Sequence, residues 1–227
     1  MQFYWLNKGN SENLIVFFAG WSFDYKPFEF LECADFDVIF VYDYGGKLIV
    51  EDGKLNNFKP DNILSHYNHK CLITWSMGSF VAYKMRDLFK DFDKKIAING
   101  TPFPVDNVYG IPEKPFLLTL KHAKTGLEGK FYQNIFDRAE EYQRYKKTPV
   151  ERTIENRVEE LQNLYENIKN SEKTYEKFFD KALVSLNDKI IPAKNQLKFW
   201  KDFDVHAETL ESGHFPYYNF KSWKELL

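Results

Sequence analysis

The segment at residues 72–80, "LITWSMGSF", places a serine where a nucleophile could form. An apolar run ends at Ser76, and the residues that follow, "GSFVAYKMRDLF", have the apolar spacing of a helix. A serine at a strand-to-helix turn has the position of a nucleophile elbow, in which the hydroxyl is exposed beside free backbone N–H groups. Gly78 supplies a small residue where helix and strand crowd, but Thr74 replaces the first glycine of the elbow pattern. The segment alone is equally compatible with a serine that only begins a helix.

A serine hydroxyl is a poor nucleophile at neutral pH, so catalysis requires a base and a group that orients the base. In this kind of fold the chain order is Ser, then Asp or Glu, then His. The run "KALVSLNDKIIP" places Asp188 at the end of a predicted strand, and "ESGHFP" places His214 after the next strand. Separately, each residue could be a turn former or an ordinary histidine, but together they predict a triad of Ser76, Asp188 and His214. The remaining histidines fit this arrangement less well: His66, His69, His122 and His206.

Such a triad also requires backbone N–H groups that stabilise an oxyanion. We expect one from Met77, directly after the serine, and one from Trp21 in "FAGWSFD", where Gly20 permits a sharp turn. Trp21 and Trp75 could also form walls of an acyl pocket, although ordinary core aromatics are an equally good interpretation.

Short apolar and β-branched runs bounded by turn residues predict a set of strands. The predicted strands are residues 2–6, 13–20, 37–44, 70–76, 94–100, 181–188 and 203–212. The first two flank the loop "NKGNSEN", which predicts an antiparallel hairpin. Several others are continuously apolar, as in a parallel sheet covered by helices on both faces. We therefore expect an α/β fold with a mostly parallel central sheet.

Residues 113–180 have helical patterns and no convincing strand, so we expect a helical insertion, a lid, between two strands of a single domain spanning 1–227. Pro149 in "KTPVE" favours separate helices on either side, because proline restricts the residue before it and is tolerated in a first helical turn.

Composition excludes several classes of protein. The chain has 227 residues, 44% of them hydrophobic, and 31 basic against 33 acidic side chains. No segment carries the surplus of Lys and Arg that a duplex nucleic-acid binder needs, so we expect no nucleic-acid partner. The 2 cysteines provide neither a disulfide framework nor a metal-ligand spacing. Because the N-terminal residues resemble no signal peptide and no apolar run approaches about 20 residues, we expect a cytoplasmic protein without membrane contact.

The chain resembles the α/β-hydrolases, and more closely the BioG type of pimeloyl-[acyl-carrier protein] methyl ester esterase of biotin synthesis. The resemblance covers essentially the whole chain, and the long segment at 97–112 is its most specific part. Thr74 departs from the glycine of the superfamily. The matching segments are "FAGWS" at 18–22, "YDY" at 42–44, "WSMG" at 75–78, "AINGTPFPVDNVYGIP" at 97–112, "ND" at 187–188 and "GHFP" at 213–216.

The resemblance implies hydrolysis of a methyl ester on a pimeloyl chain carried by acyl carrier protein, without a cofactor or a metal. Ser76 would attack the carbonyl, His214 would transfer its proton to methanol, and Asp188 would hold the imidazole tautomer. A carboxylesterase or thioesterase for another acyl substrate is an alternative, since a triad does not encode its leaving group. A hydrolase-like binding protein with a disabled elbow is a further alternative.

A carrier surface can be suggested from the arginines of the insertion. Acyl carrier protein is acidic and bears a phosphopantetheine arm, and guanidinium groups pair well with carboxylates and phosphates. We therefore expect the carrier to dock on this face, although a solvated face of mixed charge is the simpler interpretation for any single arginine. The arginines in question are Arg138, Arg144, Arg152 and Arg157.

Overall fold

The computed structural model describes residues 1–9, 11–45 and 63–227, so the expected single domain of 1–227 includes positions outside the described residues. The described residues form one seven-stranded sheet in the order β1-β3-β2-β4-β5-β6-β7. The strands are β1 (Gln2–Asn7), β2 (Asn13–Phe18), β3 (Phe36–Tyr42), β4 (His69–Trp75), β5 (Lys94–Ile98), β6 (Lys181–Ser185) and β7 (His206–Leu210). In the sheet, every neighbouring pair of strands except β1-β3 is parallel, as predicted for an α/β fold.

The predicted hairpin between the first two strands is wrong. Strand β1 pairs antiparallel with β3, with Gln2 opposite Tyr42, while β2 lies between β3 and β4. The reason is burial: β2 is buried from Leu14 to Phe18, so it needs a neighbour on each edge and cover on each face. Strand β1 has exposed and half-buried side chains and suits the edge of the sheet.

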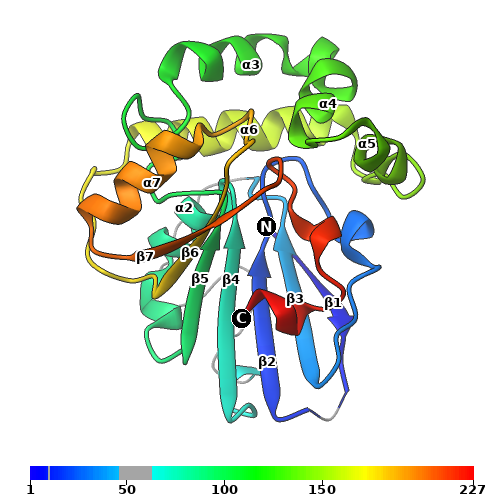
Figure 1. Cartoon of the computed structure of the whole chain (residues 1–227), viewed down its shortest axis with the longest axis vertical. Helices are drawn as coiled ribbons and strands as arrows, with labels where there is room; N and C mark the ends of the chain where they lie inside the picture. Colours follow the sequence, from blue (N-terminus) through cyan, green and yellow to red (C-terminus); the bar gives the residue numbers. More distant parts are fainter. Residues whose placement is uncertain (10, 46–62) are drawn as a thin grey trace.

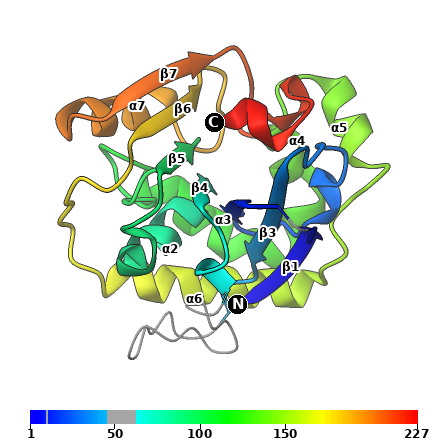
Figure 2. The same cartoon turned by 90° about the horizontal axis from the view of Figure 1, so that it is seen from below.

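Helices cover both faces of the sheet. Helix α2 (Gly78–Lys84) lies on one face, and the short C-terminal helices η4 (Tyr217–Asn219) and η5 (Trp223–Leu226) lie on the other (Figure 2). On the second face, Phe17 of β2 packs against Tyr217 and Trp223. The remaining helices outside the insertion are η1 (Lys26–Phe28), η2 (Arg86–Phe89) and α7 (Ala193–Asp202), of which α7 packs against β6 and β7.

The insertion, residues 113–180, lies over the carboxyl ends of the parallel strands (Figure 1). Its helices are α3 (Glu113–Gly126), η3 (Leu127–Phe131), α4 (Tyr132–Ile135), α5 (Ala139–Tyr145) and α6 (Ile154–Lys169). Pro149 lies in the break between α5 and α6, and the Thr153 side chain caps α6 by accepting the N–H of Asn156. The insertion therefore covers the edge of the sheet at which Ser76, Asp188 and His214 were expected.

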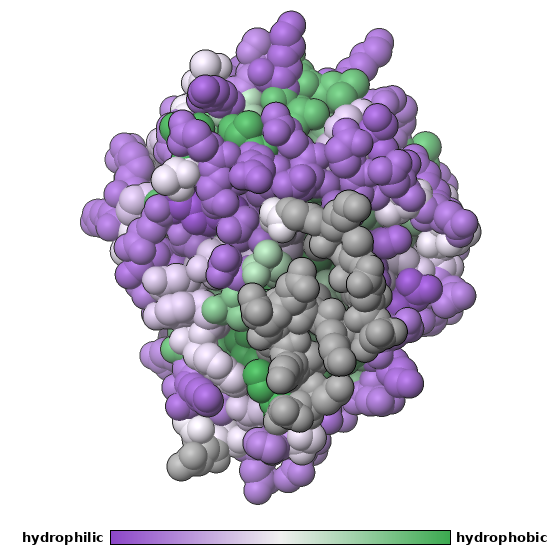
Figure 3. Space-filling model, turned by 180° about the vertical axis from the view of Figure 1, so that it is seen from behind, coloured by the Kyte–Doolittle hydropathy of each residue, from purple (hydrophilic) through white to green (hydrophobic). Residues whose placement is uncertain are grey.

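Apolar surface gathers at the end of the molecule that carries α3, as the view from behind shows (Figure 3). Leu117 and Leu118 of α3 are among the exposed large apolar side chains. No helix of the described residues is long and apolar enough to cross a membrane.

Candidate active site

Ser76 occupies a strained turn between β4 and α2. Its φ is 55°, in the left-handed region that non-glycine residues rarely adopt, and its side chain is buried. The turn brings α2 close to β2, because a Cβ on Gly78 would lie 2.4 Å from the Phe18 carbonyl oxygen. Only glycine permits this approach, so Gly78 has the packing role that the sequence suggested.

Thr74 is accommodated at the first position of the elbow. Its side chain is fully buried, and its hydroxyl lies 2.8 Å from Ser79 Oγ and donates to the Ile96 carbonyl at 3.3 Å. The β-branch suits the strand, and these bonds satisfy the polar atom that threonine adds. The departure from glycine therefore leaves the turn at Ser76 intact.

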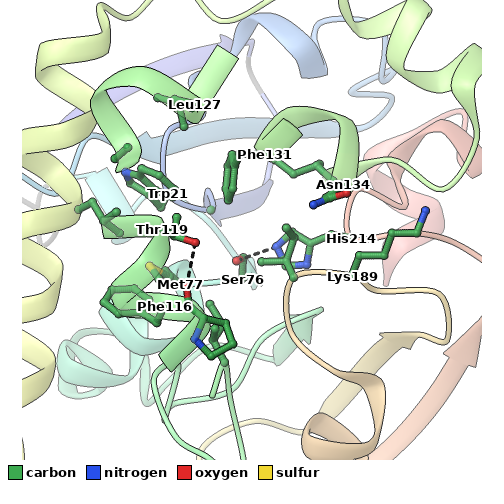
Figure 4. Close-up of a pocket in the computed structure, with 18 of the residues that line it drawn as sticks. Trp21, Ser76, Met77, Phe116, Thr119, Leu127, Phe131, Asn134, Lys189 and His214 are labelled. Atoms are coloured by element: carbon green, nitrogen blue, oxygen red, sulfur yellow. Dashed lines mark hydrogen bonds between the residues drawn. The ribbon is translucent and has the colours of Figure 1, made fainter. Parts of the chain in front are cut away.

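The structure brings Ser76, His214 and Asp188 together. His214 Nε2 lies 2.8 Å from Ser76 Oγ, and His214 Nδ1 lies 2.7 Å from Asp188 Oδ2. All three side chains are buried. This chain of hydrogen bonds would allow the imidazole to take a proton from the hydroxyl while the carboxylate holds the imidazole in the required tautomer. Figure 4 shows the hydroxyl of Ser76 directed at the imidazole of His214.

Asp188 is held by donors that sequence reasoning missed. Its Oδ1 accepts the N–H groups of Ile190 and Ile191, at 2.8 and 2.9 Å. Its Oδ2 accepts Gln196 Nε2 at 3.0 Å in addition to the imidazole. These bonds fix the orientation of the carboxylate beside the imidazole. Gln196 lies on α7, where a single glutamine in an amphipathic helix carried no signal of this role.

The loop that bears His214 is fixed from the sheet. Asn99 has a φ of 45° directly after β5, and its Nδ2 donates to the carbonyl of His214 at 3.0 Å. The indole N–H of Trp75 donates to the same carbonyl at 2.8 Å. Trp75 therefore supports the loop that bears His214, in addition to the expected position in the wall of a pocket. Asn99 stands in the "INGTP" segment, which sequence reasoning used only for the family resemblance.

A turn at residues 20–23 lies beside the nucleophile. A Cβ on Gly20 would lie 3.0 Å from both Ser76 Cβ and a ring carbon of Trp75, so glycine allows the backbone to approach the serine without displacing these side chains. Neither the N–H of Trp21 nor that of Met77 has a hydrogen-bond acceptor among the described residues. Two backbone donors next to Ser76 are thus free to bind an oxygen of a ligand.

A cavity of about 500 Å³ opens above Ser76 between the sheet and the insertion. Both Trp21 and Trp75 line it, together with Phe116, Leu127 and other apolar side chains. In Figure 4, Asn134 and Lys189 lie on the His214 side of the cavity, and Trp21 and Leu127 lie across from them. Among described residues, no carboxylate lines the cavity, whose polar members besides Ser76 and His214 are Thr119, His122, Lys130, Asn134 and Lys189.

The arginines expected to dock a carrier divide into two pairs. Arg138 and Arg144 are exposed, whereas the side chains of Arg152 and Arg157 are buried and form ion pairs. The Arg152 side chain is only 6% exposed and contacts Asp43 at 3.0 Å and Glu160 at 2.8 Å. The structure therefore does not favour docking on Arg152 and Arg157, because both guanidinium groups are buried and already paired.

No group of three or more His, Cys, Asp or Glu side chains within the described ranges is arranged to hold a metal ion. The donors at Ser76 are a hydroxyl, an imidazole and backbone N–H groups. Their arrangement suits acyl transfer through a serine.

Comparison with known proteins places the chain in a family. The family model described as pimeloyl-ACP methyl esterase BioG matches residues 1–226. The crystal structure of BioG from Haemophilus influenzae superposes with a TM-score of 0.85 at 28% identity, covering 100% of this chain and 99% of that one. An esterase from Exiguobacterium antarcticum shares the fold at 17% identity, with a TM-score of 0.63 over 92% of this chain and 87% of its own.

A longer relative matches in part. A malonyl-[acyl-carrier protein] O-methyltransferase of Bacteroides fragilis is 30% identical over 215 residues, which are 94% of this chain but 41% of that protein. The chain thus spans less than half the length of this relative. Because the family match extends over nearly all residues and the fold agrees, the chain is an α/β-hydrolase that belongs to the BioG family.

Proposed function

We propose that the chain is a serine carboxylic ester hydrolase in which Ser76 is the nucleophile. The observation that carries this proposal is the hydrogen-bond chain from Ser76 Oγ through His214 to Asp188, at 2.8 and 2.7 Å. Ser76 Oγ attacks the ester carbonyl while His214 Nε2 takes its proton. The tetrahedral intermediate expels the alcohol, which receives that proton, and leaves an acyl-enzyme. Water deprotonated by His214 then releases the acid and restores Ser76.

The free N–H groups of Trp21 and Met77 are the proposed oxyanion hole. Charge develops on the carbonyl oxygen as Ser76 attacks, and two preorganised donors stabilise that charge more than the neutral ester. Loss of one such donor typically costs about 3 kcal/mol of transition-state stabilisation.

The proposed substrate is the methyl ester of pimeloyl-[acyl-carrier protein]. Membership of the BioG family supports this choice, and the apolar lining of the cavity suits a chain of methylene groups. Hydrolysis of this ester consumes only water and yields methanol and a free carboxylate on the carrier-bound chain. The cytoplasmic location expected from the sequence stays a prediction.

The carrier is proposed to dock near the exposed arginines of the insertion and the open side of the cavity. Arg138 projects into solvent, and the Arg144 guanidinium stacks on Tyr218 at 4.1 Å from the ring centre. Lys130 and Lys189 line the cavity and have no ion-pair partner among the described residues. Unpaired cations at this position suit an acidic protein with a phosphodiester arm.

Intact mass spectrometry of the carrier tests both reaction and substrate. Methyl-pimeloyl carrier is incubated with wild type and with Ser76→Ala, a change that removes one buried oxygen and leaves the fold. We expect the wild type to remove the mass of one CH₂ and the variant to be slower by roughly 10⁵-fold or more.

Loss of the whole acyl group would identify a thioesterase instead. Unchanged carrier beside active hydrolysis of simple esters would contradict the substrate assignment alone. Equal activity of wild type and Ser76→Ala would contradict the nucleophile, and inactivity of both on every ester would favour a hydrolase-like binding protein.

A further inference from the structure

The turn at 20–23 is held almost entirely by the insertion. The N–H of Ser22 donates to Glu160 Oε2 at 3.1 Å, and Ser22 Oγ lies 2.9 Å from the hydroxyl of Tyr132. That hydroxyl also donates to the Ser22 carbonyl at 3.3 Å. The indole N–H of Trp21 donates to the carbonyl of Arg157 at 2.7 Å. Every polar atom of Ser22 therefore has a partner on α4 or α6.

The turn needs this external support because its own geometry is weak. Ser22 has a φ of 72°, a left-handed conformation that favours glycine at this position of a turn. The hydrogen bond that closes the turn, from the N–H of Phe23 to the carbonyl of Gly20, is long at 3.4 Å. Without partners on the insertion, relaxation of Ser22 would change the backbone torsions at Trp21 and so displace the Trp21 N–H, which belongs to the peptide group between Gly20 and Trp21.

Several hydrogen bonds hold the carboxylate of Glu160, which supports the turn at 20–23, in place. The carboxylate is fully buried and accepts the N–H of Tyr44 at 2.9 Å in addition to that of Ser22. Arg152 donates to it at 2.8 Å and contacts Asp43 with its other nitrogen. Burial raises the pKa of Glu160, and the nearby Arg152 charge and the backbone N–H groups oppose that rise. One carboxylate thus ties the loops after β2 and β3 to helix α6.

We propose that Glu160 and Tyr132 are positioning residues that set the oxyanion donor: they hold the turn at 20–23 so that the N–H of Trp21 faces the carbonyl oxygen of a substrate on Ser76. This inference rests on the proposed function. The insertion then has two functions, since it covers the cavity and also positions one of the two oxyanion donors. Displacement of α6 would remove an oxyanion donor along with the cover.

The test compares Glu160→Gln with Glu159→Gln, whose side chain is exposed one residue earlier on the same helix. An amide has a single acceptor oxygen, so it cannot accept from Ser22, Tyr44 and Arg152 at once. With p-nitrophenyl butyrate as substrate, we expect kcat of Glu160→Gln to fall by about 10- to 100-fold, less than the roughly 100- to 1,000-fold for complete loss of an oxyanion donor, while KM changes by less than about twofold. Glu159→Gln should retain both constants.

Binding of a trifluoromethyl ketone separates positioning from general damage. This inhibitor forms a tetrahedral adduct on an active serine and places an oxyanion in the hole. Its Ki should rise in Glu160→Gln by the factor by which kcat/KM falls. Ser22→Gly added to Glu160→Gln should restore part of kcat, because glycine adopts the positive φ without external support.

Tyr132→Phe provides a second variant in case Glu160→Gln does not fold. The phenyl ring retains the packing against Phe23 and Tyr145, whereas the bonds of the hydroxyl to Ser22 and Arg157 are lost. We expect kcat to fall by about 5- to 20-fold with KM unchanged.

A kcat within twofold of wild type in either folded variant would overturn the proposal. So would a fall in kcat without a matching rise in the Ki of the ketone. Because the ester carries no carrier protein, failure of the pimeloyl assignment leaves this test intact, and a fully active Ser76→Ala would show separately that the serine mechanism has failed.

Discussion

The two halves of the candidate site are positioned in different ways. The loop that bears His214 is held from the sheet, by Asn99 after β5 and Trp75 at the end of β4. The turn at 20–23 is held from the insertion, by Tyr132 and Glu160. In the proposed mechanism, the base is thus positioned by the sheet, and the oxyanion donor is positioned by helices packed above it. Changes in the sheet half should affect the base, and changes in the insertion half should affect stability and the oxyanion donor.

The largest effect on the sheet half is expected from Asp188→Asn. An amide oxygen can still accept the N–H groups of Ile190 and Ile191, so the fold should persist. The amide nitrogen would face the donors of Gln196 and His214, which favours the imidazole tautomer that cannot take a proton from Ser76. We expect kcat for a small ester to fall by about 10⁴-fold.

Circular dichroism should show an intact fold for this variant. Asp202→Asn, at an exposed carboxylate on α7, is the matched control and should keep its kcat. A loss smaller than tenfold in Asp188→Asn would contradict the orienting role of the carboxylate.

The insertion half is tested by Arg152→Ala. This change leaves the carboxylates of Asp43 and Glu160 without their cation inside the protein. Breaking a buried pair in this way typically costs about 3–5 kcal/mol, so urea unfolding should show a loss of that size. Arg138→Ala is the control, because Arg138 is 64% exposed and solvent screens its pair with Glu141, so the free energy of unfolding should hardly change.

The loss in Arg152→Ala should shrink in acid. The Arg152 charge lowers the pKa of Glu160 against the rise caused by burial, so its removal lets that pKa rise further. As the pH falls through this higher pKa, Glu160 becomes neutral and the uncompensated buried charge disappears. A stability difference between Arg152→Ala and wild type that grows from neutral toward acidic pH would contradict this account.

The smallest effect is expected from Trp75→Phe, which removes one of two donors to the His214 carbonyl. Asn99 still donates there, so we expect kcat to fall by about fivefold, the equivalent of about 1 kcal/mol for one neutral hydrogen bond. Trp200→Phe is a matched control, since Trp200 is equally buried and its indole nitrogen has no hydrogen-bond partner in the described structure. Equal changes in kcat for both variants would assign the effect to lost volume alone.

The sheet half could be predicted because its signals are local. Continuous apolar runs marked the strands, and each residue of the proposed triad follows a strand in the order that the fold requires. The edge pairing of β1 was mistaken because a loop rich in Gly and Asn suggests a hairpin, whereas the burial of β2 decides its neighbours. Gln196 and Asn99 carry no local mark of the bonds that they make.

Trp21 was predicted, but the contacts that hold the turn at 20–23 were missed because they join residues more than a hundred positions apart. Glu160 and Ser22 are separated by 138 residues, and Tyr132 and Ser22 by 110. In a segment of mixed charge, Glu160 and Arg152 have the pattern of a solvated face, and only the fold shows that they are buried. The same ambiguity led to the assignment of Arg152 and Arg157 to a docking surface.

The most direct test of the central claim is covalent labelling with a fluorophosphonate, followed by mass spectrometry that locates the adduct. Such probes react readily only with an activated serine. The account predicts one adduct on Ser76 in the wild type, much slower labelling in Asp188→Asn, and none in Ser76→Ala. An adduct on another residue, or equal labelling of Ser76→Ala and wild type, would contradict the claim that Ser76 is the nucleophile.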